Sequence, residues 1–401
     1  MDSTKGRSET KFLLRIMELR HRCHNRGDPF AADIVAALPR WHSRGRMLFR
    51  TIRPALFALD AETAHGLSLA ALKASDWAAP LPRVSIDPAL RVDLAGIAFP
   101  GPLGIAPGYD KNAEAPDALL RLGFGFAEIG TVTPLPQAGN PRPRLFRLVE
   151  DRAVINRMGF NNDGAEAVAT RLATRANTNG GRGGIVGVNV GANKDSSDRI
   201  ADYAAMVTRM APLASYLTIN ISSPNTPGLR ALQDEGALAA LLDAVLAARP
   251  PETNGTRPPL FLKLAPDLEG ADIEAICRLA IDRQLDALIV SNTTIARPPL
   301  RSRHAGEAGG LSGEPLRELA LQRLRDFRSA SGGAIALIGV GGIASAEDAW
   351  ARIKAGASLV QLYSAMVYQG PGVARRINRG LVRLMRRDGF SSIAEAVGTA
   401  P

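Results

Sequence analysis

Residues 216–228 read YLTINISSPNTPG. A short and largely apolar run opens this stretch, as in a buried β-strand, and a polar loop rich in turn-forming residues follows it. The same arrangement occurs eight times between residue 101 and residue 364, and segments with helical periodicity separate the runs. Eight strand-then-helix units predict an α/β fold that closes into a (β/α)8 TIM barrel rather than an open Rossmann sheet.

The predicted strands are Leu103–Ala106, Phe126–Val132, Gly184–Val190, Tyr216–Ile221, Leu260–Leu264, Ala287–Val290, Ala334–Val340 and Ser358–Leu362. Helical patterns lie between them at Leu238–Ala248, Asp272–Ile281 and Pro315–Phe327. Two longer insertions interrupt the rhythm, Asn140–Phe160 and Arg297–Gly313. Long loops in a compact domain often form lids or walls of a functional site, and we expect that role for both insertions.

The chain is predicted to divide into a basic extension at 1–46, a helical domain at 47–80 and the barrel at 81–401. The extension carries ten bases and five acids but no motif. Apolar spacing over 47–76 predicts two short helices, with Asp60 as the N-cap of the second. Such a pair either packs against the main domain or contacts a membrane surface. Prolines and short alternating runs over 77–100 predict a linker and a small hairpin.

Composition excludes several classes of protein. Two cysteines, Cys23 and Cys277, cannot form a disulfide scaffold or a CxxC site, and the five histidines include no HExxH pair. No run of 18 apolar residues exists, so no membrane-spanning helix is expected. The net charge of +10 indicates either an ordinary solvated basic surface or binding to nucleic acid, an anionic membrane surface or an anionic ligand. An aromatic content of 5%, with no aromatic residues interleaved among the arginines, argues against nucleic-acid binding.

Polar residues concentrate where the predicted strands end. These ends are PGYDKN at 107–112, GTVTP at 130–134, NVGANKD at 189–195, NISSPNTPG at 220–228, Lys263, SNTT at 291–294, GVGG at 339–342, and Tyr363 with Ser364. In barrel enzymes the carboxyl ends of the strands form the active site. The scarcity of Asp and Glu there disfavours metal-assisted hydrolysis and any metal site.

The residue types at these ends suggest the class of ligand. Asparagine offers a donor and an acceptor, which matches the amide edges of a planar heterocycle. The pair Gly341-Gly342 either makes a tight turn or provides backbone N–H groups for a phosphate. A phosphate-bearing flavin therefore fits the barrel mouth. Lys263 has two interpretations, a cation beneath a flavin or the Schiff-base lysine of an aldolase.

Five motifs, in this order, resemble those of the class 2 dihydroorotate dehydrogenases. They are EIGTVTP at 128–134, PRPRLFRL at 141–148, INRMGFNN at 155–162, NISSPNTPGLR at 220–230 and GLSG at 310–313. The resemblance extends from about Met47 to the C-terminal helix. It implies oxidation of (S)-dihydroorotate to orotate in de novo pyrimidine (UMP) biosynthesis, with FMN as hydride acceptor and a membrane quinone as final electron acceptor. It also implies peripheral attachment to the cytoplasmic side of the cell inner membrane.

The resemblance assigns roles residue by residue. Ser223 would be the catalytic base, because class 2 enzymes use a serine where class 1 enzymes use a cysteine. The substrate would be held by Lys111, Asn156, Arg157, Met158, Gly159, Phe160, Asn220, Asn225, Asn292 and Thr293. FMN would be held by Pro107, Gly108, Tyr109, Asp110, Lys111, Thr131, Asn189, Asn220, Lys263, Ser291, Gly313, Gly342, Tyr363 and Ser364. His65, Arg147 and Tyr363 would lie beside the quinone.

Three alternatives remain at this point. A phosphate-binding barrel lyase or aldolase would be colourless when purified, whereas a flavoprotein is yellow. A different flavin barrel, such as a tRNA-reducing enzyme, would not turn over dihydroorotate. A basic nucleic-acid-binding protein would show binding that falls steeply with salt.

Overall fold

The computed structural model describes residues 41–78, 83–178, 183–251 and 257–400. The chain divides into two compact units, Met1–Ile52 and Arg53–Pro401. Helix α3 spans Trp41–Ala58 and helix α4 spans Ala61–Ala78, so the predicted helical pair is confirmed, although the first helix begins earlier than expected. The rest of the predicted extension lies outside the described residues. The predicted domain boundaries at 46/47 and 80/81 stay predictions.

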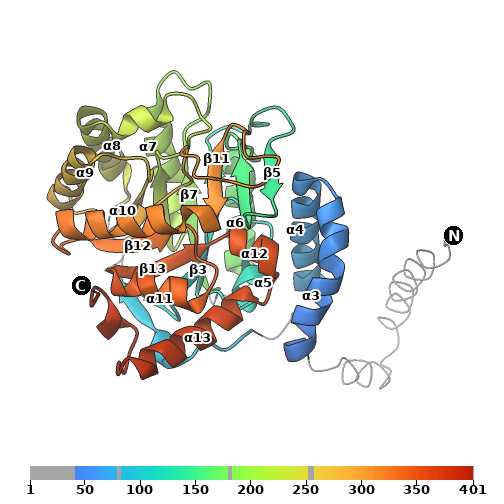
Figure 1. The fold of residues 1–401 in the computed structure, drawn as a ribbon. Helices are drawn as coiled ribbons and strands as arrows, with labels where there is room; N and C mark the ends of the chain where they lie inside the picture. The colour runs from blue at the N-terminus through green and yellow to red at the C-terminus, as the bar shows by residue number, and fades with distance from the viewer. Residues whose placement is uncertain (1–40, 79–82, 179–182, 252–256, 401) are drawn as a thin grey trace. The chain divides into compact units, whose positions relative to one another are not determined.

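Eight parallel strands close into a barrel, which confirms the predicted fold (Figure 1). They are β3 (Leu103–Ile105), β4 (Phe126–Val132), β7 (Ile185–Val190), β8 (Tyr216–Asn220), β9 (Leu260–Leu264), β10 (Ala287–Val290), β12 (Ala336–Val340) and β13 (Ala357–Leu362). Around the barrel the order is β10-β12-β13-β3-β4-β7-β8-β9. Consecutive βα units therefore lie side by side, so the polar loops that end the strands meet at one end of the barrel.

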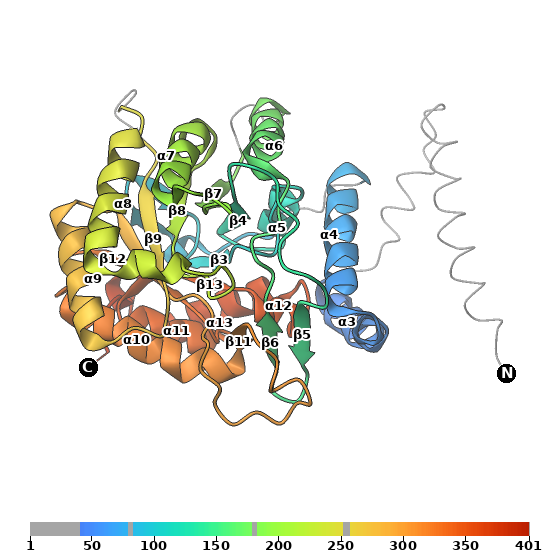
Figure 2. The ribbon, with the colours of Figure 1, turned by 90° about the horizontal axis from the view of Figure 1, so that it is seen from above.

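Helices lie around the outside of these strands (Figure 2). They are α5 (Pro116–Arg121), α6 (Gly164–Thr178), α7 (Arg199–Met210), α8 (Glu235–Ala248), α9 (Gly270–Asp282), α10 (Arg317–Ala330), α11 (Ala346–Lys354), α12 (Ser364–Gln369) and α13 (Val373–Arg387). Short 3-10 turns are η1 (Pro88–Leu90), η2 (Ala211–Leu213), η3 (Leu229–Gln233), η4 (Glu314–Leu316) and η5 (Ala394–Ala396). The three helical patterns named from sequence correspond to α8, α9 and α10.

Aromatic rings fill the lower part of the barrel, and glycines on neighbouring strands make room for them. A Cβ on Gly104 would lie 2.3 Å from the Phe126 ring, and a Cβ on Gly187 would lie 2.1 Å from the Tyr216 ring. Tyr216 also stacks on Phe261, with ring centroids 4.6 Å apart. The amino end of the barrel is therefore a packed apolar floor, and the space for a ligand is left at the carboxyl end.

The predicted hairpin is confirmed as β1 (Val92–Leu94) paired antiparallel with β2 (Ile97–Phe99). The two predicted insertions fold together as a three-stranded sheet. In this sheet, β6 (Ala153–Asn156) lies between β5 (Leu145–Leu148) and β11 (Gly310–Gly313), and both pairings are antiparallel. Phe146, Leu148, Ile155 and Leu311 give the sheet a small core of its own. Because β11 comes from the second insertion, the two insertions act as one structural element.

Candidate active site at the carboxyl end of the barrel

Strand register brings the predicted polar residues to one level of the barrel. Asn220, the last residue of β8, pairs with Lys263 on β9, and Gly130 on β4 pairs with Asn189 on β7. Side chains at paired positions point to the same face of a sheet. Asn189, Asn220 and Lys263 are all buried. The barrel therefore carries a polar layer just above its aromatic floor.

Hydrogen bonds join this layer across four strands. Thr131 Oγ1 donates to Asn189 Oδ1 at 2.6 Å, and Asn220 Nδ2 donates to both of these oxygens at 3.0 Å. Asn292 Nδ2, from the loop after β10, donates to Asn220 Oδ1 at 3.4 Å and to Ser222 Oγ at 3.0 Å. Four predicted site residues thus form one continuous network. Ser222 completes it, although the sequence had not singled out that residue as part of the site.

A buried carboxylate anchors the network from below. Glu128 accepts hydrogen bonds from Asn189 Nδ2 at 2.8 Å, from the Tyr216 hydroxyl at 3.1 Å and from Gln361 Nε2 at 2.6 Å. Because Asn189 Nδ2 donates to Glu128, its Oδ1 faces the donors of Thr131 and Asn220. Sequence reasoning assigned no role to Glu128. The sequence feature that could have indicated its role is a charged residue inside the otherwise apolar run 126–132, because a buried charge needs partners.

Lys263 supplies a positive charge in the same layer. Burial lowers the pKa of Lys263, and the charge of Glu128 opposes that shift. Across the described part of the chain, the ammonium group has no hydrogen-bond or ion-pair partner. A buried cation without such a partner can stabilise an electron-rich ring placed over the barrel mouth.

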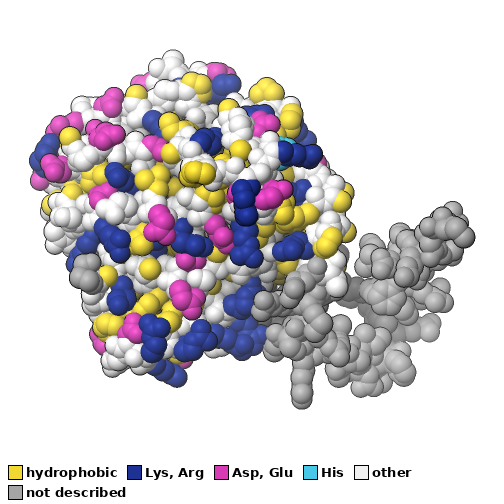
Figure 3. Space-filling model, in the orientation of Figure 1, with side chains coloured by type: hydrophobic (Ala, Val, Ile, Leu, Met, Phe, Trp, Pro, Cys, Tyr) yellow, Lys and Arg dark blue, Asp and Glu magenta, His cyan; other side chains and the backbone are white. Residues whose placement is uncertain are grey.

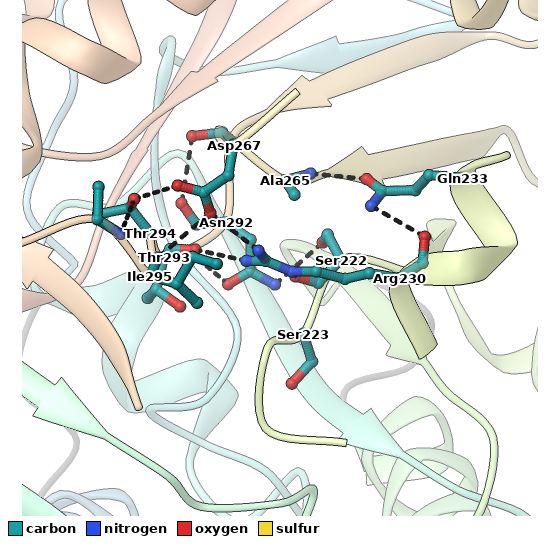
Figure 4. A network of polar contacts seen from close by, with 12 residues as sticks. Ser222, Ser223, Arg230, Gln233, Ala265, Asp267, Asn292, Thr293, Thr294 and Ile295 are labelled. Atoms are coloured by element: carbon teal, nitrogen blue, oxygen red, sulfur yellow. Dashed lines mark hydrogen bonds and ion pairs between the residues drawn. The ribbon is translucent and has the colours of Figure 1, made fainter. Parts of the chain in front are cut away.

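Ser223 lies in the loop that follows β8 (Figure 4). Its Oγ accepts a hydrogen bond from the backbone N–H of Asn225 at 3.2 Å, and its side chain is buried. Asn225 Nδ2 in turn donates to Asn156 Oδ1 at 3.1 Å, and Asn140 Nδ2 donates to the Asn225 carbonyl at 3.1 Å. The loop is therefore tied to the insertion sheet, and two predicted substrate residues, Asn156 and Asn225, are brought together with the predicted base.

Lys111 follows β3 and is also part of the barrel mouth. Its Nζ donates to Asn161 Oδ1. Burial, together with the positive charge of Arg144, lowers the pKa of Lys111 to about 7, and Glu62 opposes that shift. The ammonium group is therefore poorly stabilised by the protein alone, which suits a residue that receives an anionic ligand.

A cluster of three aromatic side chains connects the barrel mouth with α4. The ring of His65 lies 5.1 Å from that of Tyr109 and 6.4 Å from that of Tyr363. The Tyr109 hydroxyl shares a hydrogen bond with Ser68 Oγ at 3.0 Å, and the Tyr363 hydroxyl donates to the Gly108 carbonyl at 3.5 Å. Burial lowers the pKa of His65 to about 4, and Lys111 adds to the shift, so this histidine is neutral at pH 7.

The predicted phosphate loop follows β12. Gly341 and Gly342 have φ angles of 109° and 69°, and a Cβ on Gly342 would lie 2.3 Å from the Cα of Arg317. Arg352, which is 1% exposed, donates from Nη2 to the carbonyls of Arg317 and Gly341 at 2.5 and 3.0 Å. Only glycine fits this turn. The buried guanidinium holds the turn in place and gives it positive charge, which favours a bound phosphate.

Arg147 and Arg144 attach the insertion sheet to the helices. Arg147 donates to the carbonyls of Leu56, Phe57 and Leu59 at the end of α3, and its guanidinium lies 4.8 Å from the centre of the Phe57 ring. Arg144, buried, forms an ion pair with Glu62 of α4 at 2.8 Å.

The N-cap of α4 is Asp60, as predicted, because its Oδ1 accepts from the Glu62 and Thr63 N–H groups.

Several predicted residues use their polar groups for other contacts. The Asp110 carboxylate accepts from the Glu114 and Ala115 N–H groups, and its carbonyl accepts from the Gly130 N–H at 3.0 Å, so these oxygens stabilise the loop after β3. The Arg157 guanidinium pairs with Glu307 at 2.7 Å and lies over the Phe146 ring, so its side chain faces the insertion rather than the asparagine network.

Three backbone carbonyls shape the turn after β6. The Met158 carbonyl accepts from the Asn140 N–H, the Gly159 carbonyl from Gln137 Nε2, and the Phe160 carbonyl from Asn162 Nδ2. At the other side of the mouth, Ser291 Oγ donates to the Asn292 carbonyl at 3.2 Å, and the Ser364 and Ser312 hydroxyls lie 2.8 Å apart. A Cβ on Gly313 would lie 2.4 Å from the Arg152 carbonyl, so that position accepts glycine alone. Pro107 is partly exposed in the loop after β3, and Thr293 contributes its carbonyl to Arg230.

Comparison with known proteins places these features in a family. The family model described as "Dihydroorotate dehydrogenase" matches residues 89–385. The "Dihydroorotate dehydrogenase (quinone)" of Novosphingobium aromaticivorans is 68% identical over 352 residues, which cover 88% of this chain and 99% of that protein. The protein of the same name from Erythrobacter litoralis is 67% identical over 354 residues, covering 88% and 100%.

Solved structures agree with this assignment. The ligand-free DHODH from Eimeria tenella is 40% identical with a TM-score of 0.81, and the match covers 85% of this chain and 99% of that one. The same enzyme in complex with ferulenol is 39% identical, also with a TM-score of 0.81, over 86% and 98%. The chain is therefore an oxidoreductase that belongs to the quinone-dependent class of the dihydroorotate dehydrogenase family.

Proposed function

We propose that this protein oxidises (S)-dihydroorotate to orotate, with FMN as the hydride acceptor and a membrane quinone as the final electron acceptor, in de novo pyrimidine (UMP) biosynthesis. The observation that carries the proposal is the hydrogen-bonded asparagine network at the barrel mouth, flanked by Ser223 and Lys263. A planar ring with amide edges needs donors and acceptors held in fixed directions, and the network provides both.

The residues present fit FMN. The glycine turn at 341–342 would receive the phosphate, because its positive φ angles give it a backbone shape that other residues rarely adopt, and Arg352 brings positive charge to it. Lys263 would lie beside the ring system, where its buried charge has no other ion-pair partner in the part of the chain that the structure describes. Lys111 would receive the substrate carboxylate, while Asn156, Asn225 and Asn292 would hold the pyrimidine ring.

The chemistry removes a hydride from C6 and a proton from C5 of dihydroorotate. When bound, FMN supplies the acceptor for the hydride. Ser223 Oγ gives up its own hydroxyl proton to solvent as it takes the C5 proton, so the serine is unchanged after the step. The Asn225 N–H at 3.2 Å orients Oγ and stabilises the negative charge that develops there. The asparagine network keeps the substrate ring at a fixed distance and orientation from the base during the transfer.

Electron transfer to the quinone would take place beside α4. The rings of His65, Tyr109 and Tyr363 line the way from the barrel mouth to this helix. On the outer side, Leu59 and Leu67 are 40% and 51% exposed, which fits contact with lipid. No helix in the described part of the chain is long and apolar enough to cross a membrane. On the exposed leucines and the membrane quinone as acceptor, we propose peripheral attachment to the cytoplasmic side of the cell inner membrane.

Anaerobic stopped-flow bleaching of the bound flavin by dihydroorotate tests the proposal. A general base contributes about 10²–10⁴-fold, so Ser223→Ala should slow bleaching by that factor while FMN content and orotate binding are kept. Ser223→Cys should retain part of the rate, with a pH profile shifted towards that of a thiol. Ser331→Ala is a matched control, because both serines are 6% exposed but Ser331 lies before β12, at the opposite end of the barrel.

Each alternative gives a different result. A colourless protein would support an aldolase, and a yellow protein that dihydroorotate does not bleach would support another flavin barrel. Bleaching of Ser223→Ala within a few-fold of the parent rate would show that Ser223 is not the base. For the acceptor, deletion of residues 1–76 should preserve bleaching but impair reoxidation by long-chain quinones. Equal quinone turnover in that variant, or efficient turnover with NAD or fumarate as sole oxidant, would contradict the quinone proposal.

A further inference from the structure

A guanidinium joins three segments around the Ser223 loop (Figure 4). Arg230, on η3, donates from Nε to the Ser222 carbonyl at 3.1 Å and from Nη2 to the Thr293 carbonyl at 3.1 Å. Its Nη1 pairs with Asp267 Oδ2 at 2.9 Å. One side chain therefore connects the beginning of the loop after β8 with the loops after β9 and β10.

The carboxylate of Asp267 extends this connection. Its Oδ1 accepts from Thr294 Oγ1, and its Oδ2 accepts from the Ile295 N–H at 3.2 Å. Next to it, Gln233 Oε1 accepts from the Ala265 N–H at 2.9 Å, which holds η3 against the end of β9. Each of the three loops is thereby tied to the next by more than one contact.

These contacts determine how Ser223 is presented. The Ser222 carbonyl and the Ser223 N–H belong to one planar peptide unit, so a bond to that carbonyl fixes the plane from which Ser223 projects. The Ser222 hydroxyl is already held by Asn220 at 3.0 Å. With Arg230 in place, Ser222 is held on both sides. Without it, the carbonyl side of that peptide has lost its donor, and the loop of residues 223–228 can turn about it.

We propose that Arg230, held by Asp267, is a positioning residue that fixes the Ser223 loop in its reactive geometry. The inference rests on the proposed role of Ser223 as the base. An arginine is required because its planar fork reaches two carbonyls and a carboxylate at once. A lysine could keep the ion pair with Asp267 but could not satisfy both carbonyls. A displacement of about 1 Å at a reacting group can cost about 10²-fold in rate.

The chain offers a matched control at the other end of the barrel. Arg249 donates from Nε to the Pro258 carbonyl at 3.0 Å and from Nη2 to Asp286 Oδ2 at 2.9 Å. Asp286 Oδ2 also accepts from the Leu260 N–H at 2.7 Å. Like Arg230, Arg249 contacts both a backbone carbonyl and a carboxylate. This pair, however, lies where β9 and β10 begin, away from the active site.

The experiment compares Arg230→Gln and Arg230→Lys with Arg249→Gln in the FMN-loaded protein. We expect Arg230→Gln to slow flavin bleaching by dihydroorotate about 10–100-fold and Arg230→Lys to slow it less. Arg249→Gln should lower the unfolding midpoint in urea but keep the rate within about 2-fold. Amide hydrogen exchange supplies a readout independent of activity: exchange in residues 223–229 should rise in the Arg230→Gln variant and not in Arg249→Gln.

A double-mutant cycle separates positioning from a general structural effect. If Arg230 acts through Ser223, adding Arg230→Gln to Ser223→Ala should slow bleaching no further than about 2-fold. An additive loss would overturn the inference, as would unchanged exchange in residues 223–229. If Arg230→Gln does not fold, Asp267→Asn serves in its place with the same expected pattern.

The results also separate this inference from the proposed function. If Ser223→Ala bleaches slowly and Arg230→Gln bleaches at the parent rate, the positioning role alone is overturned. A Ser223→Ala variant that bleaches at the parent rate overturns the base assignment, and the positioning role with it.

Discussion

Orotate binding should weaken steeply as the pH rises above 7. Burial and the nearby Arg144 lower the pKa of Lys111 to about 7, far below its usual 10.5. In the proposed function, the carboxylate of orotate would bind the charged form of this lysine, because only an ammonium group offers it a positive charge. We therefore expect the protein to bind orotate well only where Lys111 carries its proton.

The size of the effect follows from that pKa. Above pH 7, each further pH unit lowers the charged fraction of Lys111 about tenfold, so the dissociation constant of orotate should rise about tenfold per unit. Between pH 7, where half of Lys111 is charged, and pH 9 the total is roughly 50-fold. Because the bound carboxylate restores the ammonium form, each orotate should take up about one proton at pH 8–9.

Orotate titrations, followed by the change in flavin absorption, measure the dissociation constant from pH 6 to pH 9. Calorimetry in buffers of different ionisation enthalpy counts the protons taken up. Lys111→Met should bind orotate weakly at every pH, with no proton uptake. A dissociation constant in the parent protein that stays flat from pH 6 to pH 9 would show that the charge of Lys111 does not control orotate binding.

The same pKa has a consequence for stability without ligand. The folded protein binds fewer protons at Lys111 than the unfolded chain does between pH 7 and pH 10.5. The contribution of this residue to the free energy of unfolding therefore rises with pH across that window. Below pH 7 Lys111 is charged in both states, and the cost of burying its charge lowers the stability of the folded protein in full. Lys111→Met should lack this contribution, which urea unfolding at several pH values would show.

Three further predictions concern the scaffold. Glu62→Gln leaves the buried cation of Arg144 without its carboxylate and should cost about 3–5 kcal/mol in urea unfolding, whereas Glu166→Gln, which breaks an exposed pair, should cost no more than about 1 kcal/mol; equal costs would contradict this account. Gly187→Ala places a Cβ 2.1 Å from a buried tyrosine ring and should lower the thermal midpoint by several degrees or prevent folding; a midpoint equal to the parent's would show that the barrel floor can move. Deletion of residues 1–46 should leave flavin content and quinone turnover nearly unchanged, and a loss of either would reveal a role for that segment.

The local pattern of the sequence was enough to locate the strands and the polar residues at their ends. Each strand is a short apolar run that must be buried, and its period depends only on near neighbours. The loop at 220–228 and the double glycine at 341–342 were recognisable for the same reason, since a polar loop or a special turn is written in consecutive residues. The start of α3 was placed too late, because helix ends depend weakly on local sequence.

Which of these residues meet depends on the three-dimensional packing of the chain. Glu128 contacts Tyr216 and Gln361, and Arg230 contacts Thr293, across separations that no local pattern encodes. In the same way, β11 pairs with β6 although the two strands come from different insertions. Apolar burial specifies which face of a segment points inward, but a hydrogen bond or ion pair needs a particular partner at a particular distance. That partner is set by how the barrel closes and by the strand register, and both arise from the packing of the whole chain.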